Sequence, residues 1–105
     1  MKRRPEGTVT FLFTDVEGST RLLYELGPEE YAEALAQHRR ALREAFEAHG
    51  GVEVDTQGDA FFVAFGSANE AVGAAAKAKE VLEGTPIRVR IGLHTGTLSS
   101  QKRAI

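Results

Sequence analysis

The 105-residue sequence has no cysteine and no tryptophan, and only three prolines and one methionine. Without cysteine the chain has no disulfide, no thiolate metal ligand and no thiol nucleophile. It also has no long apolar run, so we expect neither a signal peptide nor a membrane-spanning helix, which needs about 20 apolar residues. The lack of cysteine fits a reducing compartment, and we expect a cytoplasmic protein with no membrane partner.

The chain has no large surplus of either charge. It carries 13 lysines and arginines against 15 aspartates and glutamates, a formal net charge of −2 at pH 7. General nucleic-acid binders usually have a basic surplus, so we expect no nucleic-acid partner. With 42% hydrophobic and 27% charged residues, the composition is typical of a single globular domain.

The residue pattern predicts alternating strands and helices. The predicted strands are residues 8–14, 52–56, 59–65 and 87–93, with a hairpin turn at Gln57-Gly58 between the second and third. The predicted helices are a short one capped by Ser19 or Thr20 and ending at Leu26, a long one from Pro28 to His49, and one that Ser67 opens and Gly84 closes. The order β-α-β-β-α-β predicts an α+β, ferredoxin-like fold, an antiparallel sheet with helices on one face.

The predicted domain covers residues 8–97. Residues 1–7 are a predicted N-terminal arm, and residues 98–105 are a predicted unstructured tail because they are few and show no pattern. His38 and His49 lie on the apolar stripe of the long helix, and we interpret both as partly buried helix residues rather than ligands.

Alternation along the strands assigns side chains to the two faces of the sheet. It predicts one face with Val9, Phe11, Phe13, Phe61, Val63 and Phe65, and the other with Leu12 and Phe62. Because helices cover only one face, an apolar second face needs a cover, which a second copy of the chain would supply. A thick single core with a few exposed apolar residues is the alternative.

Two carboxylates are predicted to lie side by side. The first and third strands of this fold are antiparallel neighbours, Asp15 ends the first, and Asp59 begins the third. Adjacent carboxylates repel unless a proton or a cation lies between them, and Mg²⁺ prefers oxygen ligands of this kind. The residues leave two interpretations open, a metal site or two turn aspartates satisfied by backbone N–H groups.

The segment after Asp15 predicts an anion site. Gly18, Ser19 and Thr20 join a strand to a helix N-terminus, where exposed N–H groups and the helix dipole attract phosphate. Simple helix capping is the alternative. The neighbouring carboxylates favour phosphate, because nucleotide chemistry needs a phosphate site beside a cation site.

Three segments resemble motifs of class III adenylate and guanylate cyclase catalytic domains. Residues 10–20 (TFLFTDVEGST) resemble the opening motif, residues 58–62 (GDAFF) the second metal motif, and residues 90–96 (RIGLHTG) the strand and glycine turn that follow. The motifs have the family's order and spacing, and the resemblance covers about residues 7–97.

The resemblance implies two Mg²⁺ or Mn²⁺ ions, held by Asp15, Asp59 and the backbone carbonyl of Val16. With these catalytic aspartates, ATP or GTP would be converted to the 3′,5′-cyclic nucleotide and pyrophosphate, a phosphorus–oxygen lyase reaction of signal transduction. The loop from Gly18 to Thr20 would hold phosphate oxygens. The resemblance also implies a homodimer with the active site shared between the copies.

The resemblance stops before some of the family's motifs. After the glycine turn, family members supply a second purine-reading residue, then an asparagine and an arginine that stabilise the transition state, and these have no counterpart here. Asp55 stands where relatives place lysine for adenine or glutamate for guanine. It is our candidate base-binding residue, with a solvent-facing strand residue as the alternative, and the choice between ATP and GTP stays open.

Two other functions stay open. The chain is alternatively a truncated, non-catalytic cyclase core that binds metal and nucleotide, or only dimerises. RNA-recognition motifs share the same element order and stack bases on strand aromatics, here Phe61 and Phe62. The net charge of −2 and the aspartates beside the sheet disfavour RNA.

Overall fold

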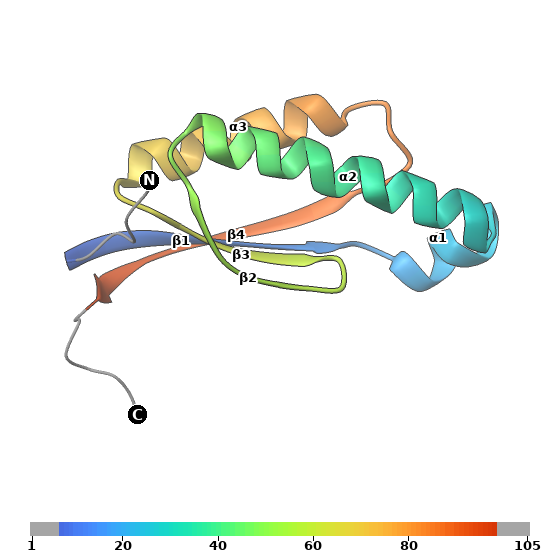
Figure 1. The fold of residues 1–105 in the computed structure, drawn as a ribbon, viewed down its shortest axis with the longest axis horizontal. Helices are drawn as coiled ribbons and strands as arrows, with labels where there is room; N and C mark the ends of the chain where they lie inside the picture. Colours follow the sequence, from blue (N-terminus) through green and yellow to red (C-terminus); the bar gives the residue numbers. More distant parts are fainter. Residues whose placement is uncertain (1–6, 99–105) are drawn as a thin grey trace.

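The computed structural model describes residues 7–98, which form a four-stranded antiparallel sheet with helices on one face (Figure 1). The strands are β1 (Gly7–Val16), β2 (Val52–Gln57), β3 (Ala60–Phe65) and β4 (Val89–Leu98), in the order β2-β3-β1-β4. The helices are α1 (Ser19–Leu26), α2 (Pro28–Ala48) and α3 (Ala68–Leu82). The predicted fold class and element order are therefore confirmed.

The first and last strands, β1 and β4, extend beyond the predicted boundaries. Gly7 pairs with Leu98, one residue outside the predicted domain at each end. The predicted last strand stops at residue 93, whereas β4 runs on because all ten residues of β1 find a partner on it. The rest of the predicted arm and tail, residues 1–6 and 99–105, lies outside the described residues.

The helix ends follow their local sequence, with one exception. Pro28 occupies the first turn of α2, and the Ser67 side chain accepts a hydrogen bond from the Glu70 backbone N–H at the start of α3. The predicted capping of α1 by Ser19 or Thr20 is wrong, because Gly18 is the N-cap and no side chain among the described residues caps this end. Within residues 7–98 no helix has the length and apolar character needed to cross a membrane.

The hairpin turn lies one residue later than predicted. Gln57 pairs with Ala60, so the two-residue turn is Gly58-Asp59. Gly58 has φ +58°, and two-residue turns favour glycine at a left-handed first position. A bulge between Glu53 and Asp55 takes up one extra residue of β2. Asp59 therefore belongs to the turn and not to the start of β3.

The predicted faces of β1 and β3 are wrong relative to each other. Leu12 lies opposite Val63, and Phe13 lies opposite Phe62, so each pair shares a face. Alternation fixes the faces within one strand, but only the register decides which faces of two strands coincide, and a shift of one residue exchanges them. Phe11 and Phe13 therefore lie on the open face, away from the helices.

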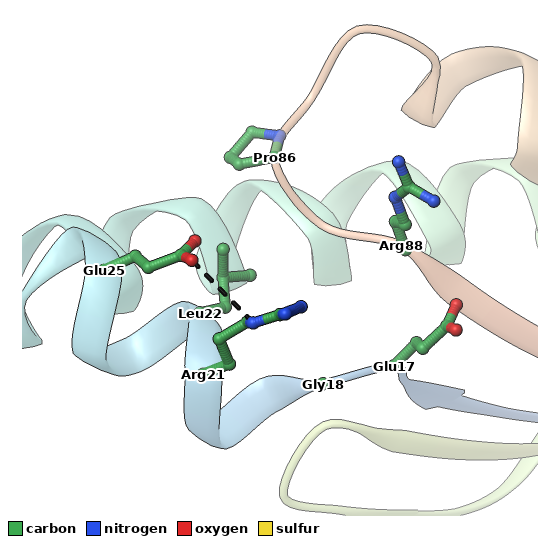
Figure 2. A pocket seen from close by; sticks show the side chains of 7 residues that line it. All are labelled: Glu17, Gly18, Arg21, Leu22, Glu25, Pro86 and Arg88. Carbon is green, nitrogen blue, oxygen red and sulfur yellow. Dashed lines mark ion pairs between the residues drawn. The ribbon is translucent and has the colours of Figure 1, made fainter.

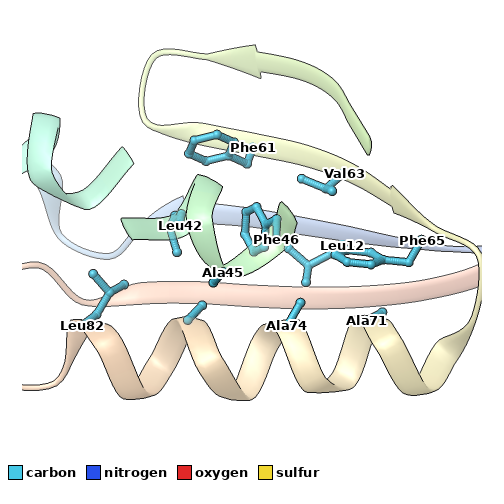
Figure 3. Close-up of a cluster of buried hydrophobic side chains, with 11 residues drawn as sticks. Leu12, Leu42, Ala45, Phe46, Phe61, Val63, Phe65, Ala71, Ala74 and Leu82 are labelled. Carbon is cyan, nitrogen blue, oxygen red and sulfur yellow. The ribbon is translucent and has the colours of Figure 1, made fainter. Parts of the chain in front are cut away.

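The core fills the space between the helices and the other face of the sheet (Figure 3). Phe46 of α2 meets Phe61 and Phe65 of β3 edge to face, with ring centroids 5.7 and 6.3 Å apart. α3 presents small side chains, Ala71, Ala74 and Ala78, all fully buried. Alanine at these positions lets α3 approach the sheet closely, and the packed layer supports the strand ends that carry the candidate site.

Candidate functional site

Asp15 lies near the end of β1, on the open face and opposite Arg90 of β4. The Arg90 guanidinium donates Nε–H to Oδ1 and a terminal N–H to Oδ2 of Asp15, each at 2.9 Å. This two-bond contact raises the pKa of Arg90. The Arg90 and Asp15 side chains are 63% and 47% exposed, so water screens the pair and a competing cation can reach the carboxylate.

A shallow hollow of about 280 Å³ lies over this ion pair. It is lined by Phe13, Thr14, Asp15, Arg90, Ile91 and Gly92. The sequence analysis did not select Arg90 as a site residue and missed its contact with Asp15. The signal was present, because the first and last strands are neighbours in the predicted sheet and both residues alternate with core positions.

Asp59 occupies the β2–β3 turn, and α2 holds this turn in place. Arg39 donates Nε–H and a terminal N–H to the Gly58 carbonyl oxygen, at 3.2 and 2.6 Å. The Asp59 charge also acts on His38 of α2: burial lowers the pKa of His38 most, Asp59 opposes that shift, and Arg39 adds to it. Asp59 is thus electrostatically linked to the helix layer.

The structure brings the two predicted metal-binding strands together without gathering a complete ligand set. Thr14 pairs with Phe61, so the next step of the register puts Asp15 beside Ala60, the neighbour of Asp59. Within residues 7–98 no three His, Cys, Asp or Glu side chains are grouped as around a metal ion. Mg²⁺ is commonly held by one or two carboxylates plus substrate phosphates. The oxygen donors present would suit such an ion if it replaced Arg90 as the partner of the Asp15 carboxylate.

The β1–α1 turn presents backbone donors directly after Asp15 and Val16. Gly18 adopts the left-handed conformation, φ 64° and ψ 38°, and its carbonyl accepts the Leu22 N–H at 3.0 Å. The first N–H groups of a helix, here those that follow Gly18, have no partner within the helix. Ser19 is half-buried and Thr20 is exposed. The predicted phosphate loop is therefore an uncapped helix N-terminus.

A pocket of about 340 Å³ opens beside this turn (Figure 2). Arg21 and Arg88 line it together with Glu17, Gly18, Leu22, Glu25 and Pro86. Arg21 contacts Glu25 at 3.9 Å with both side chains largely exposed, and the Glu17 N–H bonds the Arg88 carbonyl at 2.8 Å. Sequence reasoning did not select Arg21 or Arg88 for this pocket. Their cations stand next to the predicted phosphate loop.

Asp55, the candidate base-binding residue, lies on β2 opposite Phe62 and so on the open face. Its Oδ1 accepts the Thr56 backbone N–H at 2.8 Å, and its Oδ2 accepts a Gln57 side-chain N–H at 3.3 Å. Each carboxylate oxygen keeps further acceptor capacity, so Asp55 can still accept a hydrogen bond from a ligand.

An aromatic cluster, formed by Phe11, Phe13 and Phe62, covers part of the open face. Phe62 stacks on Phe13 with centroids 4.9 Å apart and contacts Phe11 at 5.1 Å. Phe13 is 42% exposed. An apolar second face therefore exists, but it is formed by Phe11, Phe13 and Phe62 and not by the predicted pair Leu12 and Phe62. Phe61, which the RNA-binding alternative requires for stacking, is 2% exposed in the core.

Comparisons with known proteins agree on one family. The sequence model described as the adenylate and guanylate cyclase catalytic domain matches residues 1–103. An uncharacterised protein of Mycobacterium tuberculosis is 44% identical over 94 residues, which are 88% of this chain and 32% of that protein. An adenylate cyclase structure from Trypanosoma brucei, in its monomeric state, matches with TM-score 0.79 and 26% identity over 90% of this chain and 58% of that chain.

A further solved structure, the guanylate cyclase domain from Catenaria anguillulae in complex with GTP, has the same fold. Its TM-score is 0.75 at 22% identity, over 90% of this chain and 59% of that chain. The chain spans about a third of the M. tuberculosis relative and less than two thirds of both solved chains. Since the family model matches nearly every residue and the fold agrees, this chain belongs to the adenylate and guanylate cyclase catalytic domain family.

Proposed function

We propose that this domain converts ATP or GTP to the 3′,5′-cyclic nucleotide and pyrophosphate in signal transduction. One observation carries the proposal: Asp15, the uncapped N-terminus of α1 and the Gly58-Asp59 turn meet at the same end of the sheet. Helix N-termini attract phosphate and carboxylates attract divalent cations. A nucleoside triphosphate with its metal ions needs both in one site.

Asp15, Asp59 and the Val16 carbonyl are the proposed ligands of two Mg²⁺ or Mn²⁺ ions. When bound, these ions would neutralise triphosphate charge and activate the ribose 3′-hydroxyl. Asp15 accepts both hydrogen bonds from Arg90 in this structure, so ion binding requires it to leave that arginine. Arg90 is then free to meet the incoming negative charge of the triphosphate.

The N–H groups that follow Gly18 are the proposed donors to the triphosphate oxygens, helped by Ser19 and Thr20. Arg21 and Arg88 line the adjoining pocket and offer cations to the same oxygens. The proposed base contact is Asp55, which faces the same side of the sheet as the aromatic cluster. A carboxylate there can accept hydrogen bonds from guanine N–H groups or from the adenine amino group.

A second copy of the chain is the proposed cover of the aromatic cluster. Stacked rings of Phe13 and Phe62 offer a flat apolar surface beside Asp15 and Asp55, and no helix of the described part covers this face (Figure 1). A symmetric contact buries the same patch on both copies, so each exposed ring counts twice in the dimer. Two sheets that face each other would also bring two sites together.

The proposed activity is tested by incubating the 105-residue protein with Mn²⁺ and either ATP or GTP, and identifying products by chromatography and mass spectrometry. We expect cyclic AMP or cyclic GMP, and at least a 100-fold loss in Asp15→Asn and Asp59→Asn, a typical cost of losing a charge-stabilising group. Glu33→Gln, which alters an exposed carboxylate on α2, is the matched control and retains activity. Cyclic product that survives both aspartate variants would contradict the assignment.

The non-catalytic alternative makes a different prediction in the same samples. Such a core gives no cyclic product, yet Mn²⁺ with nucleotide raises its melting temperature, and the Asp15→Asn and Asp59→Asn variants lose that rise. A folded protein that neither turns over nor is stabilised by Mn²⁺ with nucleotide would contradict the metal and nucleotide site altogether.

The proposed dimer is tested by sedimentation velocity over a range of protein concentrations. Phe13→Ser removes an exposed ring from each copy, so we expect the dimer dissociation constant to rise at least about tenfold. Val72→Ser, which alters an exposed apolar side chain on α3, should leave dimerisation unchanged. Equal dimerisation in both variants would exclude the aromatic cluster as the contact.

A further inference from the structure

An arginine of α2 contacts the turn between β2 and β3. Gln57 pairs with Ala60, so Gly58 and Asp59 are the two central residues of this turn. Arg39 donates Nε–H and a terminal N–H to the Gly58 carbonyl oxygen, at 3.2 and 2.6 Å. Because the peptide unit is planar, this carbonyl and the Asp59 N–H belong to one rigid plane. Arg39 therefore sets the orientation of the peptide that leads into Asp59.

The orientation of this peptide is the variable feature of a two-residue turn. Turn types I and II, and likewise I′ and II′, differ mainly by a flip of the peptide between the two central residues. Both primed types need a positive φ at the first central residue, and Gly58 has φ +58°. Glycine itself permits either orientation of the peptide that follows it. A flip would change the direction in which the Asp59 side chain leaves the backbone, so an outside contact that prevents it also orients Asp59.

The strands of the hairpin are held to α2 independently of Arg39. Arg43 donates two hydrogen bonds to the Glu53 carboxylate of β2, at 3.0 and 3.2 Å. Its guanidinium also lies over the Phe61 ring, 5.2 Å from the centroid. Arg39 and Arg43 are one helical turn apart, so both lie on the side of α2 that faces the hairpin. Loss of Arg39 should therefore release the turn without releasing the strands.

We propose that Arg39 is a positioning residue that acts through Asp59: it holds the turn peptide in the orientation in which the Asp59 carboxylate can bind a divalent ion. This role rests on the proposed function, in which Asp59 is a metal ligand. Both hydrogen bonds of Arg39 go to the backbone, and none of the ion pairs within residues 7–98 includes the Asp59 carboxylate. That carboxylate is therefore left available to a cation, unlike Asp15, which is paired with Arg90.

Positioning and simple charge predict opposite effects of removing Arg39. A cation near the site repels a divalent ion, so the loss of its charge alone should tighten Mn²⁺ binding. If Arg39 positions Asp59, its loss should weaken Mn²⁺ binding, because only molecules with the competent turn bind the ion at full affinity. We expect the Mn²⁺ dissociation constant of Arg39→Gln to rise about 3- to 10-fold, the range that one hydrogen bond typically contributes.

The orientation of the turn is tested by NMR on the 105-residue protein without metal. The residual dipolar coupling of the Asp59 N–H bond reports the orientation of the Gly58–Asp59 peptide. We expect this coupling to change in Arg39→Gln, because two orientations are then averaged, while the couplings of β2 and β3 stay as in the parent protein. Arg43→Gln, which breaks the contact of α2 with β2, is the matched control and should leave the Asp59 coupling unchanged. An unchanged Asp59 coupling in Arg39→Gln would overturn the proposal.

Calorimetry with Mn²⁺ on the same proteins tests whether the turn matters to the ion. Arg39→Gln and Asp59→Asn should both bind more weakly than the parent protein, and Arg39→Lys, which can still donate to the carbonyl, should lie between Arg39→Gln and the parent. Arg40→Gln, which removes an exposed arginine of α2, should bind like the parent.

The outcomes separate the two proposals. If Asp59→Asn binds Mn²⁺ more weakly but Arg39→Gln binds it as tightly as the parent protein or more tightly, the metal site stands and the positioning role of Arg39 is overturned. If Asp59→Asn binds Mn²⁺ as tightly as the parent, Asp59 is not a metal ligand, and both the proposed metal site and the positioning role are wrong.

Discussion

Acid should destabilise this protein through His38. Burial lowers the pKa of His38 below its ordinary value near 6.5, with Asp59 opposing the shift and Arg39 adding to it. The folded-state pKa is therefore below the unfolded-state pKa, and the unfolded chain binds a proton that the folded protein does not. Stability from this group is fully present above about pH 6.5 and is lost as the pH falls below that value.

The size of the effect follows from one proton per molecule. Between the unfolded and folded pKa values, the free energy of unfolding falls by up to about 1.4 kcal/mol for each pH unit. Carboxylates with lowered pKa, such as Glu53 beside Arg43, add their loss of stability at more acidic pH, below about 4.5. The range just below pH 6.5 therefore reports His38 with least interference from the carboxylates.

The assay is urea unfolding followed by circular dichroism at pH 8, 7, 6 and 5, for the parent protein and His38→Leu. We expect the free energies of unfolding of the two proteins to change together from pH 8 to 7 and to diverge below pH 6.5, where the parent loses stability more steeply. Comparing the proteins at each pH cancels the titrating groups that do not interact with His38. Parallel curves down to pH 5 would refute the reasoning, because they would mean that folded His38 binds its proton as readily as the unfolded chain.

The remaining predictions concern the candidate site and the core. Arg90→Gln should tighten Mn²⁺ binding a few-fold, because it frees the Asp15 carboxylate from the guanidinium. Calorimetry measures the Mn²⁺ affinity, and the control Arg88→Gln should leave it unchanged. Weaker binding in Arg90→Gln would contradict competition between the guanidinium and the ion. Gly51→Ala should destabilise the protein by about 1–3 kcal/mol, because the added Cβ would lie 2.8 Å from the buried Phe65 ring. The control Gly66→Ala should be tolerated, because its Cβ would meet no atom within 4 Å. Thermal unfolding compares the stabilities of the two variants.

Local signals were sufficient to predict the elements and their order. Pro28 at the start of a helix, Ser67 with Glu70 at a capping box, and alternation over residues 87–93 each carry their information within a few residues. The register between strands is not local, and it depends on how all the side chains of two strands pack together. That is why Leu12 and Phe62 were assigned to the wrong faces relative to their neighbours.

The candidate site was likewise predicted only in part from local sequence. The motifs around Asp15, Gly18 and Asp59 identified which backbone segments meet at one end of the sheet. The partners of these residues come from distant elements: Arg90 from β4, and Arg39, which fixes the turn of Asp59, from α2. The predicted strand neighbours did carry a signal for Arg90, whereas the Arg39 contact depends on rotamers and packing, which sequence patterns do not predict.

These partners have a common consequence for the proposed activity. The carboxylate of Asp15 is already compensated by a cation of the protein itself, so a divalent ion would exchange with Arg90 rather than add to an uncompensated charge. The exchange lowers the apparent affinity for the ion alone, but it releases a guanidinium beside the place where triphosphate would bind. Metal and nucleotide should therefore bind more tightly together than separately, because the Arg90 guanidinium that the metal displaces from Asp15 can then bind the phosphates.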